Sequence, residues 1–306
     1  MSPIKKVAIF GASGNFGVPT TDALIGADFD VTVFTRPEST SAFQGKVPVV
    51  RVDYADYEAV CTALRGMDAV VNLLNPAQMP HSKGLVDAAY RAGVGRFIIN
   101  DFGWGLNKNA LPEFKPFGDM RRVAWYAAME HAREDEAKDG DGGFSWTGIT
   151  IGNPLDWALR MGFRTGFDLN KQTATIYDDG TEEFTGTTLE GIVQSVLGVL
   201  SHPAETKNRF VKVRSIQVSQ NTLLAAFQKV TGKEWTVERS TAKELLEEGR
   251  RKHSQGDQGW ILDLLLFQLY SPGEKRCIVT SLEDSDNKLL GVREESAEEI
   301  VRKALA

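Results

Sequence analysis

Three glycines near the amino terminus have a spacing that could bind a phosphate group. They occur in the segment Gly11–Gly17, which reads G-x-x-G-x-x-G and directly follows the apolar run Val7–Phe10. In such a turn the glycines permit a tight bend, close approach of the backbone to a pyrophosphate, and close packing of the next helix. The amino terminus of that helix presents free N–H groups to the anion. The pattern therefore predicts a dinucleotide-binding loop, with a purely structural turn as the alternative. The expected contact residues are Gly11, Ser13, Gly14, Asn15, Phe16 and Gly17.

The end of the next apolar run indicates which dinucleotide would bind. A site for NAD normally has a carboxylate there for the ribose 2′-hydroxyl, whereas this chain has Thr35-Arg36. A guanidinium suits a 2′-phosphate, and Lys46 is a further candidate donor. Glu38 lies close enough to complicate this assignment, and a surface arginine that caps a strand is the alternative reading. The sequence favours NADPH/NADP over NADH.

Other candidate residues follow two later apolar runs. In an open α/β sheet, ligands bind over the carboxyl ends of the strands. Leu74 and Asn75 would flank the ribose and pyrophosphate there, and Phe102 and Trp104 would border the nicotinamide or a planar substrate. Ordinary packing is the alternative for both aromatic side chains. His81, in the loop after the fourth run, is a weaker substrate candidate.

Other catalytic patterns are absent from the sequence. None of the six tyrosines is followed four residues later by lysine, so the chain lacks the Tyr-x-x-x-Lys pair of ordinary short-chain dehydrogenases. It has no G-x-S-x-G motif for acyl chemistry. His, Cys, Asp and Glu show no metal-ligand spacing, so no metal is expected.

Five continuous apolar runs must position these residues. They are 7–10, 31–34, 47–50, 69–74 and 96–99, with helix-like stretches at 17–25, 57–65 and 84–92. Continuous rather than alternating runs indicate strands that are buried on both faces. A long helix from about 117 to 139 and a sixth strand at 144–152 follow. This alternation predicts an α/β fold with a Rossmann-type doubly wound parallel sheet.

The pattern changes after residue 153. Short strands at 174–177 and 209–213 mix with helices at 189–200, 220–230, 241–252 and 260–270. We therefore expect an NAD(P)-binding Rossmann domain over 1–153 and a smaller α+β substrate-binding lobe over 154–306, with the active site between them. Trp157 and Phe163 fall at this junction, where a planar ligand could be clamped. Helix 260–270 is apolar nearly all round and is expected to be buried.

With these residues in view, the chain resembles the NmrA-like branch of atypical short-chain dehydrogenases. It is close to the isoflavone reductase and phenylcoumaran benzylic ether reductase group, and most like its fungal members. The resemblance covers nearly the whole chain and rests on the glycine loop, Thr35-Arg36, Asp101-Phe102-Gly103, residues 152–157 and residues 202–209. It implies NADPH and a small aromatic or secondary-metabolite substrate held between the lobes. Asn153 and Pro154 belong to the expected cofactor site.

The resemblance also exposes a gap in the catalytic machinery. The reductase group is thought to use a lysine in a stretch like Phe-x-x-Lys-x-x-Val, and here Met120 takes that position after Phe117. Methionine cannot transfer a proton. Lys115, Tyr126 or a buried Asp101 could act as the acid instead, or an electrophilic acceptor such as a quinone methide could need no strong acid. A dinucleotide-binding regulator without turnover, and an isomerase or cyclase that retains the cofactor, remain open alternatives.

Composition sets the background for these expectations. The 306 residues include 41 Asp+Glu and 35 Lys+Arg, a net charge of -6 that is not gathered in blocks. This argues against nucleic-acid binding, and no apolar run is long enough to span a membrane. Two widely spaced cysteines fit a reducing compartment. We expect a cytoplasmic monomer or homodimer.

Overall fold

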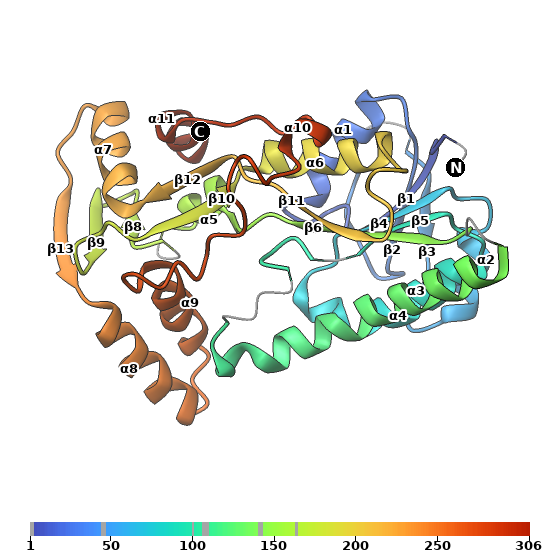
Figure 1. Cartoon of the computed structure of the whole chain (residues 1–306), viewed down its shortest axis with the longest axis horizontal. Coiled ribbons are helices and arrows are strands. Elements are labelled where there is room, and N and C mark those ends of the chain that lie inside the picture. The colour runs from blue at the N-terminus through green and yellow to red at the C-terminus, as the bar shows by residue number, and fades with distance from the viewer. Residues whose placement is uncertain (1–2, 44–46, 100, 106–109, 140–142, 163–164) are drawn as a thin grey trace.

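A parallel sheet of seven strands organises the computed structural model of the protein, which describes residues 3–43, 47–99, 101–105, 110–139, 143–162 and 165–306 (Figure 1). The strand order is β11-β6-β5-β4-β1-β2-β3, and every neighbouring pair is parallel. The strands are β1 (Lys6–Phe10), β2 (Asp30–Thr35), β3 (Val49–Arg51), β4 (Ala69–Asn72), β5 (Arg96–Ile99), β6 (Ser145–Thr150) and β11 (Arg209–Lys212). The predicted doubly wound sheet is confirmed. Because the strand order reverses between β1 and β4, a crevice for ligands is expected above their carboxyl ends.

Helices cover both faces of this sheet, since successive side chains of a strand point to opposite sides. Phe10, Val70 and Phe97 pack with one group of helices below the sheet in Figure 1, and Ile9 and Val71 pack with another group above it. The first group is α2 (Tyr57–Leu64), α3 (Ser82–Arg91) and α4 (Lys115–Asp139), and the second is α1 (Gly17–Gly26), α6 (Leu189–Ser201) and α10 (Asn287–Leu290). Burial on both faces explains why the strands read as continuous apolar runs. Short 3-10 helices, η1 (Pro76–His81) and η2 (Pro112–Phe114), precede α3 and α4.

The second half of the chain contributes to the large sheet. β11 pairs with β6, with Arg209 opposite Thr147, and Ile192 and Val196 of α6 belong to the core cluster that contains Ile9 of β1. Two elements from beyond residue 153 therefore complete the nucleotide-binding layer. The expected division at 153/154 stays a prediction.

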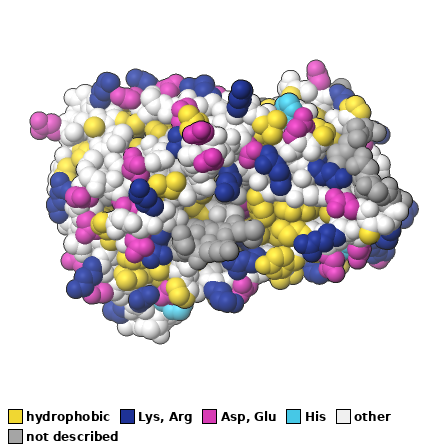
Figure 2. All heavy atoms as spheres, in the orientation of Figure 1, with side chains coloured by type: hydrophobic (Ala, Val, Ile, Leu, Met, Phe, Trp, Pro, Cys, Tyr) yellow, Lys and Arg dark blue, Asp and Glu magenta, His cyan; other side chains and the backbone are white. Residues whose placement is uncertain are grey.

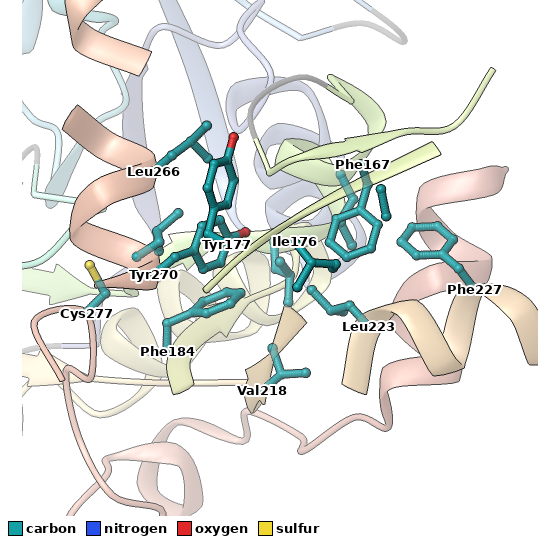
Figure 3. Packing of buried hydrophobic residues seen from close by; sticks show 14 of the residues in the cluster. Phe167, Ile176, Tyr177, Phe184, Val218, Leu223, Phe227, Leu266, Tyr270 and Cys277 are labelled. Atoms are coloured by element: carbon teal, nitrogen blue, oxygen red, sulfur yellow. The ribbon is translucent and has the colours of Figure 1, made fainter. Parts of the chain in front are cut away.

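The remaining elements build two three-stranded sheets, β12-β10-β7 and β13-β9-β8. Their core gathers Phe167, Phe184, Phe227 and Tyr270; in Figure 3 Phe167 lies beside Phe227, and Phe184 lies beside Tyr270. Helix α9 is buried in this core, as predicted from its apolar surface. The strands are β7 (Asn153–Pro154), β8 (Phe167–Asp168), β9 (Thr173–Tyr177), β10 (Glu183–Thr187), β12 (Ile216–Ser219) and β13 (Thr236–Ser240). The helices are α5 (Leu155–Arg160), α7 (Gln220–Thr231), α8 (Ala242–Ser254), α9 (Trp260–Tyr270) and α11 (Ala297–Leu305).

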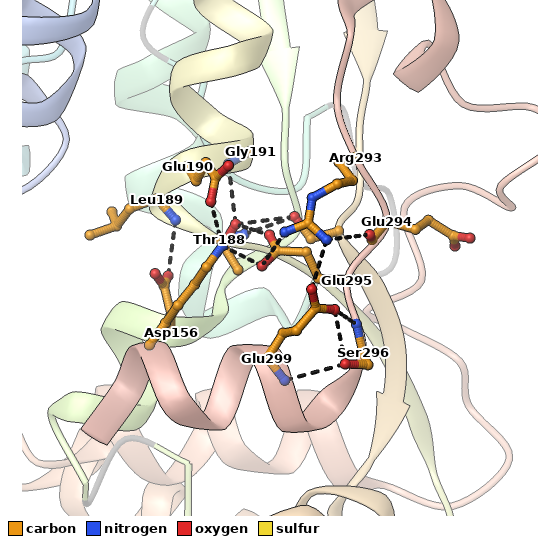
Figure 4. A network of polar contacts seen from close by, with 12 residues as sticks. Asp156, Thr188, Leu189, Glu190, Gly191, Arg293, Glu294, Glu295, Ser296 and Glu299 are labelled. Carbon is orange, nitrogen blue, oxygen red and sulfur yellow. Dashed lines mark hydrogen bonds and ion pairs between the residues drawn. The ribbon is translucent and has the colours of Figure 1, made fainter. Parts of the chain in front are cut away.

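A polar network ties the carboxyl-terminal helix α11 to α5 and α6 (Figure 4). The Thr188 hydroxyl accepts a hydrogen bond from Gly191 N at 3.1 Å, which caps α6, and donates to Glu295 Oε1 at 2.5 Å. Glu295 also pairs with Lys303 of α11. Asp156 of α5 accepts from Leu189 N at 3.0 Å. These contacts fix α6, which packs on the face of the large sheet that also carries α1.

Two further observations concern the whole molecule. Cys61 and Cys277 are both free and buried. Among the helices in the described ranges, none combines the length and the apolar character needed to cross a bilayer.

Candidate functional site

The glycine loop after β1 is shaped by close backbone contacts. Gly11 has φ +82°, and a Cβ atom there would lie 2.5 Å from Leu73 O, the carbonyl that follows β4. At Gly17 a Cβ would lie 2.0 Å from Gly11 O. Gly14 N donates to Gly11 O at 3.0 Å, which closes the turn. A side chain at Gly11 or Gly17 would break this geometry, so both glycines are required sterically.

The same loop has open space beside it, where a phosphate group could approach the backbone. Ser13, Gly14 and Asn15 are exposed, and a Cβ at Gly14 would meet no atom closer than 3.2 Å. Helix α1 begins at Gly17 and its first turn has no side-chain cap from Phe16. Val18 N already donates to Gly14 O at 3.0 Å and Pro19 has no N–H. Among the described contacts, none occupies the N–H groups of Asn15, Phe16 and Gly17, so these groups could bind an anion at the amino terminus of the helix. The residues present fit the pyrophosphate of a dinucleotide.

Arg36 lies where β2 ends, beside the glycine loop in the strand order. Its side chain is 47% exposed and Nη1 lies 3.2 Å from Glu38 Oε1. An exposed pair of this kind contributes ~0–1 kcal/mol, so the guanidinium can exchange Glu38 for a phosphate at small cost. Lys46, the second predicted donor, lies outside the described residues.

Three aromatic side chains from separate segments meet at this edge of the sheet. The ring of Phe16 in the glycine loop lies 6.2 Å from that of Phe102, which follows β5, and 6.5 Å from that of Trp157 in α5. Gly103 O accepts hydrogen bonds from Ile151 N at 3.0 Å and Gly152 N at 2.9 Å, which joins the segment after β5 to the segment after β6. The structure therefore brings together three residues that the sequence assigned to cofactor or substrate.

Asp101 is the most strongly perturbed acid of this region. It is fully buried, and burial raises its pKa to about 6. The Thr150 hydroxyl donates to Oδ2 at 2.6 Å and Gly105 N donates to Oδ1 at 3.1 Å, and both bonds favour the charged form, as does the nearby Arg121 guanidinium. Asp101 therefore combines deep burial with a raised pKa, a combination that is frequent at functional sites.

Comparison with known proteins now identifies the group to which the site belongs. A family model described as NAD(P)H-binding matches residues 11–177, which span the glycine loop and the strands β2 to β6 of the large sheet. The chain belongs to this NAD(P)H-binding family. The predicted class of cofactor is thereby confirmed.

Relatives within the family refine this assignment. Oxidoreductase poxI of Penicillium oxalicum is 48% identical over 295 residues, 96% of this chain and 92% of the relative. An isoflavone reductase homolog of Zea mays, IRL, is 26% identical over 79% of this chain and 81% of its own. The solved structure of AtPrR2 with NADP+ and (+)pinoresinol shares the fold, with a TM-score of 0.79, 19% identity and 99% of both chains covered. The chain is an NAD(P)H-dependent oxidoreductase of the isoflavone reductase-like type, as its sequence predicted.

The family's lysine position and its predicted substitutes do not come together. Met120 is 39% exposed on α4, and Tyr126, further along the helix, is 56% exposed. Lys115 pairs with Asp119 on the same exposed surface. None of the contacts of the described residues joins Lys115 or Tyr126 to Asp101. Of the three predicted proton donors, the structure places Asp101 among the site segments.

The remaining predicted residues are distributed around the site. Leu74 is buried after β4 and Asn75 is exposed beside it. Asn153 is buried, and its Nδ2 has no hydrogen-bond partner within the described ranges. Pro154 is half-buried next to it, and Trp104 is half-buried with its indole N–H likewise unpartnered. Such buried donors are the groups that a bound ligand would satisfy.

Two predicted substrate residues have a different outcome. His81 ends η1, and its ring lies 6.4 Å from the ring of Tyr54 rather than with Phe16 and Trp157. The Tyr54 hydroxyl donates to Phe34 O of β2 at 2.9 Å, so His81 lies toward the Arg36 side of the sheet. Phe163 lies outside the described residues.

Arg121 is a site residue that sequence reasoning missed. It follows Met120 on α4, and its Nη1 donates to Asp101 O at 3.4 Å. Burial lowers the pKa of its guanidinium and the Asp101 carboxyl group raises it. In the sequence Arg121 and Arg122 look equivalent, and the available signal was a charged side chain one position after the expected lysine.

The surface carries two other features, an exposed apolar row on α4 and a cavity at the opposite end of the sheet. Exposed apolar side chains gather along α4, among them Phe117, Met120, Val123 and Tyr126 (Figure 2). A cavity of about 600 Å³ lies at the amino ends of β1 and β2, where Lys6 is among its lining residues. That end of the sheet is opposite the glycine loop, so the cavity does not belong to the dinucleotide site.

Proposed function

We propose that the protein is an NADPH-dependent reductase that delivers hydride to a small, largely apolar aromatic acceptor. The observation that carries the proposal is the meeting of Phe16, Phe102 and Trp157 next to the glycine loop, at the carboxyl ends of β1, β5 and β6. Aromatic side chains of this kind form the walls of sites for planar ligands. The pinoresinol bound in the solved structure of AtPrR2 supports an aromatic acceptor for a protein with this fold.

Residues from both sides of β1 would hold NADPH. The glycine loop would bind the pyrophosphate, Arg36 the 2′-phosphate, and Leu74 and Asn75 the adjoining ribose. Asn153 would donate a hydrogen bond from its unpartnered Nδ2 to the nicotinamide half of the cofactor. The cofactor, when bound, supplies the hydride, and the protein orients it and excludes water.

The nature of the acceptor follows from the missing lysine. Met120 offers no proton, and Lys115 and Tyr126 are directed to the surface. Asp101 is too deeply buried to reach a substrate directly, although Thr150 connects it to its surroundings. We therefore propose acceptors that are electrophilic enough to accept hydride without a strong acid, such as quinone methides and activated enones. The Trp104 indole N–H would donate a hydrogen bond to the acceptor oxygen.

A direct test follows the absorbance of reduced nicotinamide during incubation of the protein with NADPH and a panel of phenols, enones and quinone methides. We expect oxidation of NADPH with the electrophilic members and little with simple phenols. A matched assay with NADH should be slower at the same concentration. Tight binding of NADPH without consumption by any acceptor would overturn the proposal.

A second candidate function has one specific observation in its favour. The exposed apolar side chains of α4, from Phe117 to Tyr126, include Met120 at the family's lysine position and could contact a partner protein. In this alternative the protein binds NADPH as a redox-sensing regulator and does not consume it. Conversion of an acceptor with NADPH retained would instead favour an isomerase or cyclase.

A further inference from the structure

Phe102 has a backbone conformation that bulky residues rarely adopt. Its φ is +35°, in the region normally occupied by glycine or by asparagine and aspartate. Its ring is 7% exposed and packs 6.2 Å from the ring of Phe16. Such strain persists only where the surrounding structure enforces it, and it concentrates at functional sites. The residues on either side of Phe102 should therefore be held firmly.

Hydrogen bonds fix both neighbours of Phe102. Before it, Asp101 N donates to Ile99 O at 2.8 Å, and the carboxylate accepts from Thr150 and Gly105. After it, Gly103 O accepts from Ile151 N and Gly152 N. The bonds from Thr150, Ile151 and Gly152 anchor the segment 101–105 to the end of β6, the neighbour of β5 in the sheet.

Arg121 reaches the segment from helix α4. Its Nη1 donates to Asp101 O at 3.4 Å, and a Cβ on Gly103 would lie 3.0 Å from the same nitrogen. The guanidinium thus bonds to one neighbour of Phe102 and lies close to the other. Arg121 also lines a cavity of about 10 Å³ with Met79 and Ser82. A cavity of that size holds about one water molecule and no substrate.

We infer that Arg121 is a positioning residue that holds Phe102 against the glycine loop and so shapes the place of the nicotinamide half of NADPH. The inference rests on the proposed function, since it places NADPH across the strand ends. From Arg36 at β2 to Phe102 at β5 the sheet has three strand spacings, each ~4.8 Å, or about 14 Å in all. The 2′-phosphate end therefore binds far from Phe102, and Arg121 acts on the other end of the cofactor.

The test compares two ligands in binding titrations: NADPH, and 2′,5′-ADP, which carries the 2′-phosphate but no nicotinamide. For Arg121→Met we expect the Kd for NADPH to rise about tenfold and the Kd for 2′,5′-ADP to stay within twofold of the wild type. Arg121→Lys, which keeps a donor and the charge, should recover most of the NADPH affinity. The matched control is Arg122→Met, because Arg122 lies on the same turn and donates to Asp119 at 2.9 Å instead; it should leave both constants unchanged.

A second variant covers the case in which Arg121→Met does not fold. Gly103→Ala keeps the buried charge but pushes a methyl group against Nη1, so it should weaken NADPH selectively as well. The inference is overturned if the folded variants raise the Kd values for NADPH and 2′,5′-ADP equally, or raise neither. Failure of the wild type to oxidise NADPH would refute the proposed hydride transfer, while the two binding constants would still decide the role of Arg121.

Discussion

Replacement of Arg36 by alanine tests the choice of NADPH over NADH. A hydrogen bond between Arg36 and the 2′-phosphate would contribute about 1.5–3 kcal/mol to binding. Binding would also break the ion pair between Arg36 and Glu38, which costs up to about 1 kcal/mol. The side chain is 47% exposed, which keeps the net effect at the lower end. We expect Arg36→Ala to weaken NADPH by about 1–2 kcal/mol, roughly five- to thirtyfold in Kd, and to leave NADH within twofold.

Fluorescence titration of both reduced nucleotides measures this difference directly. Glu38→Gln removes the competitor of the phosphate, so it should tighten NADPH by up to about fivefold. Arg65→Ala is the matched control, because Arg65 is exposed near the amino end of β4, away from the glycine loop. If Arg36→Ala weakened NADH and NADPH equally, Arg36 would not be the phosphate ligand and the reasoning from β2 would be refuted.

Three further substitutions test other parts of the site. Gly11→Ala places a Cβ 2.5 Å from Leu73 O at a positive φ, so it should lower thermal stability and reduce NADPH affinity at least tenfold; wild-type affinity would contradict the loop geometry. The pKa of Asp101 is about 6 in the folded protein and 3.8 in an ordinary aspartate, so between these values the folded state holds a proton that the unfolded state has lost. The free energy of unfolding should therefore fall by about 2–3 kcal/mol as pH rises from about 4 to 6. Denaturant titration should show Asp101→Asn without this component; an unchanged pH profile would contradict the raised pKa. Met120→Lys should leave the rate with quinone methides within threefold of the wild type, because those acceptors need no acid. A large gain with them, measured by NADPH oxidation, would show that the acceptor class was misjudged.

Local sequence signals were enough to predict the nucleotide half of the candidate site, and that assignment stays a prediction. The glycine loop and Arg36 are set by residues close together in the chain, at the ends of β1 and β2. In a doubly wound sheet, adjacent parallel strands bring their carboxyl ends to one edge. Positions after β1, β4 and β5 could therefore be assigned to the crevice without knowledge of side-chain contacts.

Side-chain direction was not available from the same signals. Arg121 and Arg122 are neighbours of the same type, yet Arg121 contacts Asp101 O and Arg122 contacts Asp119. The rotation of α4 about its axis decides which of them faces the sheet, and that rotation depends on packing against α3 and β6. Lys115 shows the same limit, since its pairing with Asp119 removes it from the site.

The sequence by itself determined the class of fold, the class of cofactor and the edge of the sheet where the cofactor is expected to bind, because periodicity and loop spacing are local properties. Tertiary structure decided the rest. It paired β11 with β6 across more than fifty residues, brought Trp157 to Phe16, and buried Asp101 so that its pKa rises. These outcomes depend on contacts between residues far apart in the chain, and desolvation of a carboxyl group is a property of its surroundings rather than of its place in the sequence.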